Sequence, residues 1–426
     1  MAIDPRALPI RRNTALLSAA LAVNSAMLQL AAAVATLTFA LVVGIEGLLG
    51  LGPALVLATG AVTALPAGRA MDRFGRKPVL MAGFATGVAG ALLTALGAGL
   101  EQPAAVVLGF VCIGAAAGVA LLARTAAGDM YPPARRARGI ALVLFGAVFG
   151  AILGPAVFSP LLAGRDLDAD ALVLPWTAAA GFMVVGLLLI SLVRPDPRTI
   201  AELLAGDARD RPEERLPAAP LRELVRRPGV IPSLLAAVAS FSVMVGVMNL
   251  TGYVVVEEHG HASHTVFPII GAHVIGMYAL VLVVGDLIDR IGRLPALTGG
   301  LALMAVSTIS LLWVTSVVAT AVVLFVLGLG WNFSFVAATA QLADRTAPHE
   351  RGKLLGFSDL LSGLTGAGLA LLGGYALSVL GVAALAIAGT VLVVAPAAWI
   401  ARTGAGFREA AAATIVSRRT PGPPPL

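Results

Sequence analysis

The chain has 426 residues, of which 58% are hydrophobic and only 12% are charged. A soluble domain usually has about 25% charged residues, so this composition excludes an ordinary globular protein surrounded by water. The net charge of +6 is not carried by a basic soluble domain, which argues against a nucleic-acid-binding protein. We therefore expect a polytopic membrane protein in contact with a lipid bilayer.

Apolar stretches of about 20 residues, the length that crosses a bilayer, follow one another along the chain. The twelve stretches lie near 14–38, 46–68, 79–99, 104–127, 139–163, 172–193, 231–256, 265–287, 296–316, 318–341, 355–379 and 382–401. The first is too long for the core of a signal peptide and is followed at once by a second span, so we interpret it as a retained helix. The predicted fold is an all-α membrane protein with twelve transmembrane helices.

The basic residues predict the orientation of these helices. With the spans above, all 29 Lys and Arg residues except Arg124 and Arg165 fall on one side of the membrane. The positive-inside rule makes that side cytoplasmic. Both termini are then expected in the cytoplasm.

Two segments between predicted helices are alike and indicate an internal repeat. GRAMDRFGRKPVL at 68–80 and GDLIDRIGRLPAL at 285–297 share seven of thirteen positions. A weaker repeat pairs residues of two later loops: Asp129 with Asp344, Pro133 with Pro348, and Arg136 with Arg351. Such repeats are typical of secondary transporters. They predict two six-helix halves, 1–193 and 230–402, a charged cytoplasmic linker at 194–229 with a short surface helix near 199–205, and a cytoplasmic tail at 403–426.

The repeated loops carry candidate gating residues. Gly is the residue type that lets neighbouring helices touch, while Asp and Arg would lock the halves together through charge-assisted hydrogen bonds. These residues are Gly68, Asp72, Arg73, Gly75, Arg76 and Lys77 in the first copy and Gly285, Asp289, Arg290 and Arg293 in the second. Alternatively, basic loops only satisfy the positive-inside rule. We favour gating because the repeated Asp and Gly positions have no topological reason to recur.

The pattern GxxxDRxGRK formed by the first copy resembles the loop signature of the major facilitator superfamily, and the second copy matches nearly as well. The resemblance implies the major facilitator fold and secondary transport by alternating access. The expected location is the bacterial inner membrane, as a multi-pass and monomeric protein. No nucleophile–base set, catalytic metal motif or phosphate loop is found, so neither an enzyme nor an ATP-driven pump is expected.

Polar side chains inside apolar spans are costly in a bilayer and mark candidate functional positions. Arg124 partly resembles the fourth-helix element of proton-coupled members of the superfamily, and Asp359 is the best further candidate for proton coupling. A helix-capping or interface role for Asp359 is the alternative. Trp331 and Asn332 are candidates to line the cavity, although Asn332 would equally serve as an interhelical hydrogen-bond partner.

Methionine and histidine residues give a candidate metal site. Met244 and Met248 share one face of the seventh span, as do His273 and Met277 on the eighth. Met248 and His273 are each predicted about 12 Å below the outer surface, and thioether and imidazole ligands suit Cu(I). The connecting loop contains His259, His261 and His264, a tract that would recruit metal. Methionine also fills gaps in helix packing, which is the alternative.

The MxxxM and HxxxM pair resembles the CcoA-type copper importers (CalT family), which supply copper for assembly of cbb3-type cytochrome oxidase. The resemblance implies that these four side chains bind copper as the transported substrate, with no resident cofactor. The alternative is an organic-solute carrier, either a multidrug–proton antiporter or a flavin importer. A receptor or copper-holding assembly factor is a third possibility, which the duplicated gating loops disfavour because a static scaffold does not need them.

Overall fold

The computed structural model describes residues 8–44, 51–162, 169–204, 219–255, 259–261 and 265–419, and within these ranges the chain is helical with short turns and contains no strand. The N-terminal half consists of α1 (Ile10–Thr38, continued by the π-helical η2 Phe39–Val43), α2 (Leu51–Phe74), α3 (Arg76–Gly99), α4 (Pro103–Leu121), α5 (Ala123–Asp129), η4 (Pro133–Arg135), α6 (Arg136–Leu144), α7 (Gly146–Leu162), η5 (Asp170–Leu172) and α8 (Val173–Ser191).

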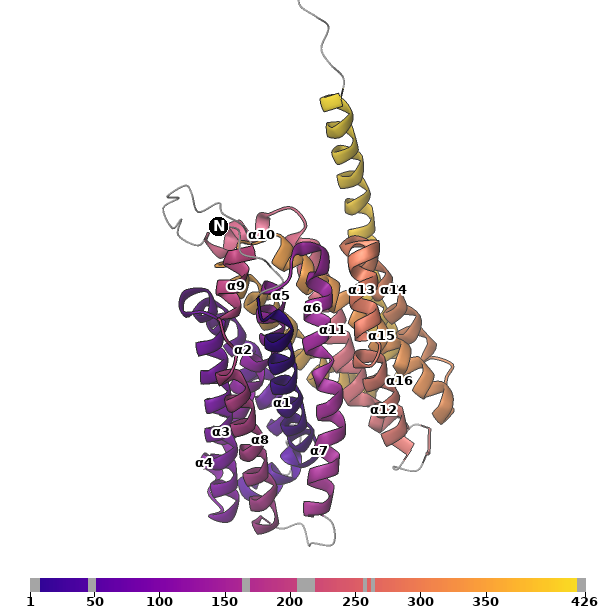
Figure 1. The fold of residues 1–426 in the computed structure, drawn as a ribbon. Coiled ribbons are helices and arrows are strands. Elements are labelled where there is room, and N and C mark those ends of the chain that lie inside the picture. Colours follow the sequence, from indigo (N-terminus) through magenta and orange to yellow (C-terminus); the bar gives the residue numbers. More distant parts are fainter. Residues whose placement is uncertain are drawn as a thin grey trace, which may run out of the picture.

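The linker contains the short helices α9 (Pro197–Leu204) and α10 (Leu221–Arg226), and α9 lies where a surface helix is predicted. The C-terminal half consists of α11 (Val230–Tyr253), α12 (Val266–Tyr278), α13 (Val281–Ile291), α14 (Arg293–Ser310), α15 (Val317–Asp344) and α16 (Arg351–Arg419). Gly381 has a non-helical backbone inside α16, so two helices meet there. The two halves lie side by side, with the linker helices, the start of α1 and the end of α16 at one end of the bundle (Figure 1).

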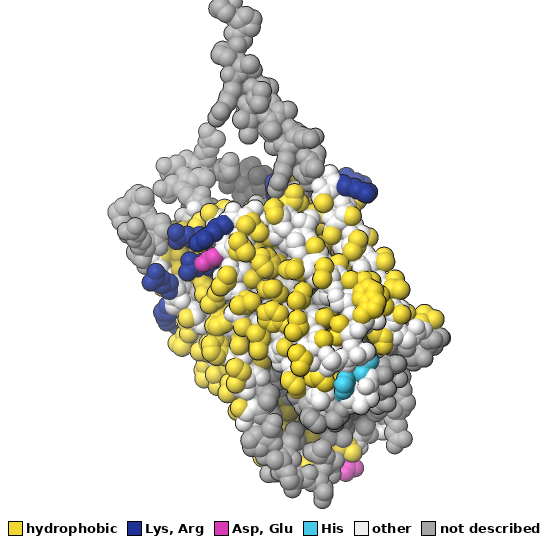
Figure 2. All heavy atoms as spheres, turned by 90° about the vertical axis from the view of Figure 1, so that its right-hand side faces the viewer, with side chains coloured by type: hydrophobic (Ala, Val, Ile, Leu, Met, Phe, Trp, Pro, Cys, Tyr) yellow, Lys and Arg dark blue, Asp and Glu magenta, His cyan; other side chains and the backbone are white. Residues whose placement is uncertain are grey.

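The all-helical membrane architecture predicted from the sequence is confirmed. Within the described residues, ten helices are long and apolar enough to cross a membrane, and they coincide with ten of the predicted spans. Large apolar side chains such as Leu96, Val283 and Val318 are exposed on the outside of the bundle, where lipid would cover them. Figure 2 shows apolar side chains between an end that carries basic residues and an opposite end with histidine side chains.

Several helix boundaries differ from the predicted spans. α2 and α13 continue through the charged repeats to Phe74 and Ile291, whereas the predicted spans end at 68 and 287. The helices continue because their charged ends are paired with the other half of the protein, as described below. The predicted span 104–127 is broken at Leu122, between α4 and α5. There the Arg124 Nη1 donates a hydrogen bond of 3.0 Å to the Leu121 carbonyl, in place of a backbone donor.

The halves contact each other chiefly along two helix pairs, α2 with α16 and α6 with α13. Gly68 of α2 lies so close to α16 that a Cβ atom would overlap the carbonyl oxygen of Gly352. Gly285 of α13 also packs closely against α6, where a Cβ atom would lie 2.7 Å from the Cβ of Ala141. The first glycine of each repeat therefore occupies a close contact between halves, as the sequence predicts.

Candidate functional site

The first repeat builds a charged connection between the halves at the end that carries the linker. The Asp72 carboxylate accepts hydrogen bonds from the backbone N–H groups of Gly352 (2.8 Å) and Lys353 (2.6 Å). These N–H groups belong to the first turn of α16, where backbone donors lack partners within the helix and the helix dipole is positive. Asp72 thus caps a helix of the opposite half.

Arg76 extends this connection. Its guanidinium group is fully buried and pairs with Asp72 (2.8 Å) and with Asp129 (2.7 Å). It also donates to the carbonyl of Pro348 in the other half at 2.5 Å. Asp129 in turn accepts a hydrogen bond of 2.7 Å from Arg351. Each charge therefore has at least one partner of opposite sign, which is the condition for ion pairs to be tolerated away from water.

The second repeat builds the same connection with the halves exchanged. Asp289 accepts from the N–H groups of Ala137 (3.4 Å) and Arg138 (3.1 Å) at the start of α6. Arg293 pairs with Asp289 (2.5 Å) and with Asp344 (3.2 Å), and Asp344 also pairs with Arg136. We call these eight side chains the latch: the first copy is Asp72, Arg76, Asp129 and Arg351, and the second is Asp289, Arg293, Asp344 and Arg136.

The other residues of the repeated loops have different surroundings. Gly75 separates α2 from α3 with a φ of +99°, a conformation that favours glycine. Lys77 donates to the Ser191 carbonyl at 2.6 Å, within its own half. Arg73 and Arg290 are exposed, and the Arg73 guanidinium lies 5.0 Å from the centre of the Phe74 ring. The structure thus brings Asp72, Arg76, Asp289 and Arg293 into the latch and leaves Arg73 and Arg290 at the surface.

A further ion pair joins the halves inside the membrane-spanning region. Arg124 of α5 pairs with Oδ1 of Asp359 of α16, and only 1% of the Arg124 side chain is exposed. Asp359 follows Arg351 of the latch by eight residues, which is about 12 Å along the helix. The second carboxylate oxygen, Oδ2, is buried and has no hydrogen-bond partner among the described residues. This oxygen is therefore a candidate position for a coupling proton, as the sequence predicts for Asp359.

An aromatic column extends from this ion pair toward the opposite end. The Arg124 guanidinium lies 4.8 Å from the centre of the Phe335 ring, and Phe335 stacks on Trp331 at 4.9 Å with an interplanar angle of 16°. Tyr278 meets Trp331 edge-on at 5.8 Å, and Phe241 lies 5.9 Å from Phe335. We call these four rings, which come from α11, α12 and α15, the aromatic column.

Polar atoms beside the aromatic column lack partners. The Trp331 indole nitrogen and both polar atoms of the Asn332 side chain are buried without a hydrogen bond in the part of the chain that the structure describes. Leaving such a group unpaired costs about 1–3 kcal/mol, so these atoms are candidate hydrogen-bond partners for a water molecule or a solute. Asn24 Oδ1 of α1 and Ser362 Oγ of α16 are in the same situation.

The sequence singled out Trp331 and Asn332 but missed Phe335, Phe241, Tyr278 and Asn24. The available signal was the aromatic pair at 331 and 335, which share a helix face because they are four residues apart.

The candidate copper ligands lie on two helices of the C-terminal half. His273 is fully buried, and its Nδ1 lies 2.8 Å from the Leu324 carbonyl of α15. A carbonyl only accepts, so Nδ1 carries the hydrogen and, in the neutral ring, Nε2 presents a lone pair. Met277 packs beside Gly328, so the His273–Met277 face is directed at α15. On α11, Met244 is buried and Met248 is half-buried.

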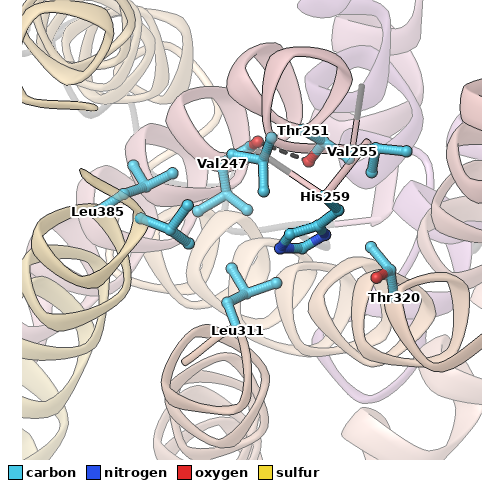
Figure 3. A pocket seen from close by; sticks show the side chains of 9 residues that line it. Val247, Thr251, Val255, His259, Leu311, Thr320 and Leu385 are labelled. Carbon is cyan, nitrogen blue, oxygen red and sulfur yellow. Dashed lines mark hydrogen bonds between the residues drawn. The ribbon is translucent and has the colours of Figure 1, made fainter. Parts of the chain in front are cut away.

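The histidines of the outer loop make local contacts. His261 Nε2 lies 2.7 Å from the Thr315 carbonyl, and the rings of His259 and His261 are 6.3 Å apart. Figure 3 shows the His259 ring at a small, mostly apolar cavity that is lined by Val247, Thr251, Val254, Val255, Leu311, Thr320, Val382 and Leu385. His264 lies outside the described residues, and within these ranges no cluster of three His, Cys, Asp or Glu side chains is suited to a metal ion. Metal recruitment by this loop stays a prediction.

The protein consists of two packed helical halves. A duplicated charge network joins them at one end, and a buried ion pair joins them further inside. This arrangement is that of a membrane transporter. The chain belongs to the Major Facilitator Superfamily, whose family model matches residues 14–370 and 247–414. It is therefore a secondary transporter and not an enzyme.

Relatives of known sequence include two bacterial proteins. The chain is 31% identical over 335 residues to YdeG of Bacillus subtilis, described as an uncharacterised MFS-type transporter, with 78% of this chain and 77% of the relative covered. It is 32% identical over 312 residues to RfnT of Brucella anthropi, described as a riboflavin transporter, with 71% and 73% covered. These relatives do not identify the copper-importing branch.

Solved structures agree on the fold. The human organic anion transporter MFSD10 has a TM-score of 0.72 at 16% identity and covers 92% of this chain and 100% of its own. The Escherichia coli fucose–proton symporter FucP has a TM-score of 0.71 at 14% identity, with 93% and 99% covered. At these identities the likeness concerns the fold alone.

Proposed function

We propose that this protein transports a flat aromatic solute with several hydrogen-bonding groups, of the kind represented by riboflavin, across the bacterial inner membrane. The observation that carries the proposal is the aromatic column, with the unpaired polar atoms of Trp331 and Asn332 beside it. A flavin ring system would stack on such aromatic side chains, and its ring nitrogens and carbonyls would bond to the unpaired atoms. The similarity to the riboflavin transporter RfnT supports the same solute class.

The proposed cycle is alternating access. The proposed topology has twelve spans with both termini in the cytoplasm. It adds α14 and the first part of α16 to the ten helices described above. In this orientation the latch closes the cytoplasmic side, and the aromatic column lies between the latch and the outer side. Release of the latch would open the cytoplasmic side.

The solute assignment is tested by uptake of labelled riboflavin into bacteria that lack their own riboflavin transporter. We expect the wild-type chain to support uptake and Trp331→Leu to raise the half-saturating concentration about fivefold, because loss of one ring stack costs about 1 kcal/mol. Trp313→Leu is the matched control, since that indole is 74% exposed on the outside of the bundle. Uptake no faster than in cells without the protein, or equal uptake by the Trp331 and wild-type chains, would contradict the proposal.

Copper import is the second candidate. It is favoured by the buried His273 imidazole, whose Nε2 has no hydrogen-bond partner among the described residues, and by the buried sulfur-containing side chains of Met244 and Met277. These are ligand types that suit Cu(I).

The copper candidate is tested by replacing both Met244 and Met248 with Leu. The exchange conserves volume and usually costs under about 1.5 kcal/mol, but it removes the sulfur lone pairs. If copper is the substrate, this variant and His273→Gln will lose copper accumulation at normal protein level. Met304→Leu, at a buried position on α14, is the control. Copper accumulation by the double variant at the wild-type rate would remove copper as a candidate.

A further inference from the structure

The linker between the halves is attached to the first copy of the latch at its N-terminal end. The Asp196 carboxylate accepts hydrogen bonds from the backbone N–H groups of Arg76 (3.1 Å) and Lys77 (2.8 Å). These are the first N–H groups of α3, which have no partner within the helix. A linker residue thus caps the helix that presents the Arg76 guanidinium to the latch.

Arg198 reinforces this attachment from the other side of the turn. Its guanidinium donates to the backbone carbonyls of Asp72 and, at 3.5 Å, of Arg73, at the end of α2. Its own N–H donates to Asp196 at 2.8 Å. The Asp196 carboxylate is so close to the turn that a Cβ atom on Gly75 would lie 2.9 Å from it. Asp196 and Arg198 together hold the turn between α2 and α3, and with it Asp72 and Arg76.

The C-terminal end of the linker is attached to the opposite half, beside the same copy of the latch. Glu350 accepts hydrogen bonds from both terminal nitrogens of Arg227 (2.7 and 3.1 Å) and from the N–H of Ala219. Burial alone would raise the pKa of the Glu350 carboxyl, but these donors outweigh burial and hold its pKa below the usual value. Lys353 donates through Nζ to the Ala219 carbonyl at 2.8 Å, while its backbone N–H is bound by Asp72.

Among the described residues, the second copy of the latch has no comparable brace. In the described ranges, no carboxylate of the linker reaches the start of α14, the counterpart of the start of α3. The position that corresponds to the linker lies after the last predicted span. There the chain continues as the C-terminal part of α16. The two copies are therefore equivalent in their charges but not in what holds them.

We propose that Asp196 and Arg198 are positioning residues of the latch, and that the linker must be seated on the turn between α2 and α3 for the cytoplasmic side to close. The linker is then a part of the gate, and anything that lifts it would favour opening. This inference rests on the gating role of the latch within the proposed function and is independent of which solute is transported.

The test measures how often the cytoplasmic side opens, without any substrate. A single cysteine is placed at Ala141 in a Cys112→Ser background, because Ala141 is fully buried against Gly285 between the halves and on the side of the second latch copy. N-ethylmaleimide labels it in the purified full-length protein only when the halves separate. We expect Asp196→Asn, which replaces an acceptor with a donor facing Lys77, and Arg198→Gln each to raise the labelling rate about tenfold, the effect of losing charge-assisted hydrogen bonds.

Glu223→Gln is the control, because Glu223 lies on the same linker but is exposed. The Tm of each variant is measured alongside, since loosening of the fold as a whole would lower the Tm and raise labelling together. Faster labelling at unchanged Tm in both variants supports the proposal. Labelling at the wild-type rate in both, or an equal increase in Glu223→Gln, overturns it, whatever the riboflavin experiment gives.

Discussion

Asp359→Asn is expected to abolish accumulation of solute against its gradient while leaving exchange of solute across the membrane in place. The Asp359 carboxylate is held by Arg124 through one oxygen, and its other oxygen is buried without a partner among the described residues. Protonation of that oxygen would neutralise the carboxyl group and free Arg124. A cycle driven by a proton gradient needs both states of the carboxyl, and Asn offers only a neutral one.

Two uptake assays in vesicles separate these steps. Accumulation driven by an imposed pH gradient should fall to background, because an Asn side chain can neither take up nor release the coupling proton. Counterflow, in which unlabelled solute inside exchanges for labelled solute outside, should persist because exchange does not require the proton to leave. Asp170→Asn, at an exposed position, is the control.

Either of two results would contradict proton coupling at Asp359. Normal accumulation by Asp359→Asn would place the coupling group elsewhere. Loss of counterflow together with accumulation, at normal protein level, would mean that the pair with Arg124 is needed for every movement of the halves.

The sequence was most informative about the latch. All eight of its charged side chains occur in the two alignments of the repeat. In the structure, residues that are paired in these alignments make equivalent contacts in the two copies of the latch. This was predictable because a charge next to a membrane needs a partner, and a repeated spacing identifies which loops are equivalent. The same spacing did not reveal that Arg73 and Arg290 lie at the surface, since neighbouring arginines look alike in a sequence.

The aromatic column could not be predicted in the same way. In a membrane helix both faces are apolar, so the periodicity that separates inside from outside in a soluble helix is lost. Phe335 is almost completely buried and Trp313 is mostly exposed, yet both lie in similar apolar stretches. Only packing distinguishes them.

His273 illustrates how far the depth and the direction of a side chain can be predicted from the sequence. Its Nδ1 lies beside the carbonyl of Leu324, seven residues or about 10 Å into α15, while its depth of about 12 Å below the outer surface stays a prediction. Its direction is set by the close contact of Met277 with Gly328 on α15, and no spacing within the eighth span encodes that contact.

Asp72→Asn is expected to open the cytoplasmic side more often than Asp289→Asn does, although the two residues are counterparts in the repeat. Asp72 binds the N–H groups of α16 at 2.6–2.8 Å, whereas Asp289 binds those of α6 at 3.1–3.4 Å. Shorter hydrogen bonds to a charged acceptor are the stronger ones. The first copy is also braced by the linker, and Gly68 allows the closest helix contact beside it.

The magnitudes follow from the bonds that each substitution weakens. A hydrogen bond to a charged group contributes about 1.5–3 kcal/mol, so Asp72→Asn should raise labelling of a cysteine at Ala141 by about 10–100-fold. Asp289→Asn should raise this labelling less than about tenfold, because its hydrogen bonds to the backbone are long and its pair with Arg293 is the main loss.

Both variants should reach normal membrane levels, since the helices themselves are intact. Asp72→Asn should lower the rate of solute uptake because the closed state is less populated. Equal labelling of the two variants would show that both copies of the latch contribute equally to keeping the cytoplasmic side closed. Normal uptake by Asp72→Asn at normal expression would exclude the latch from the transport cycle.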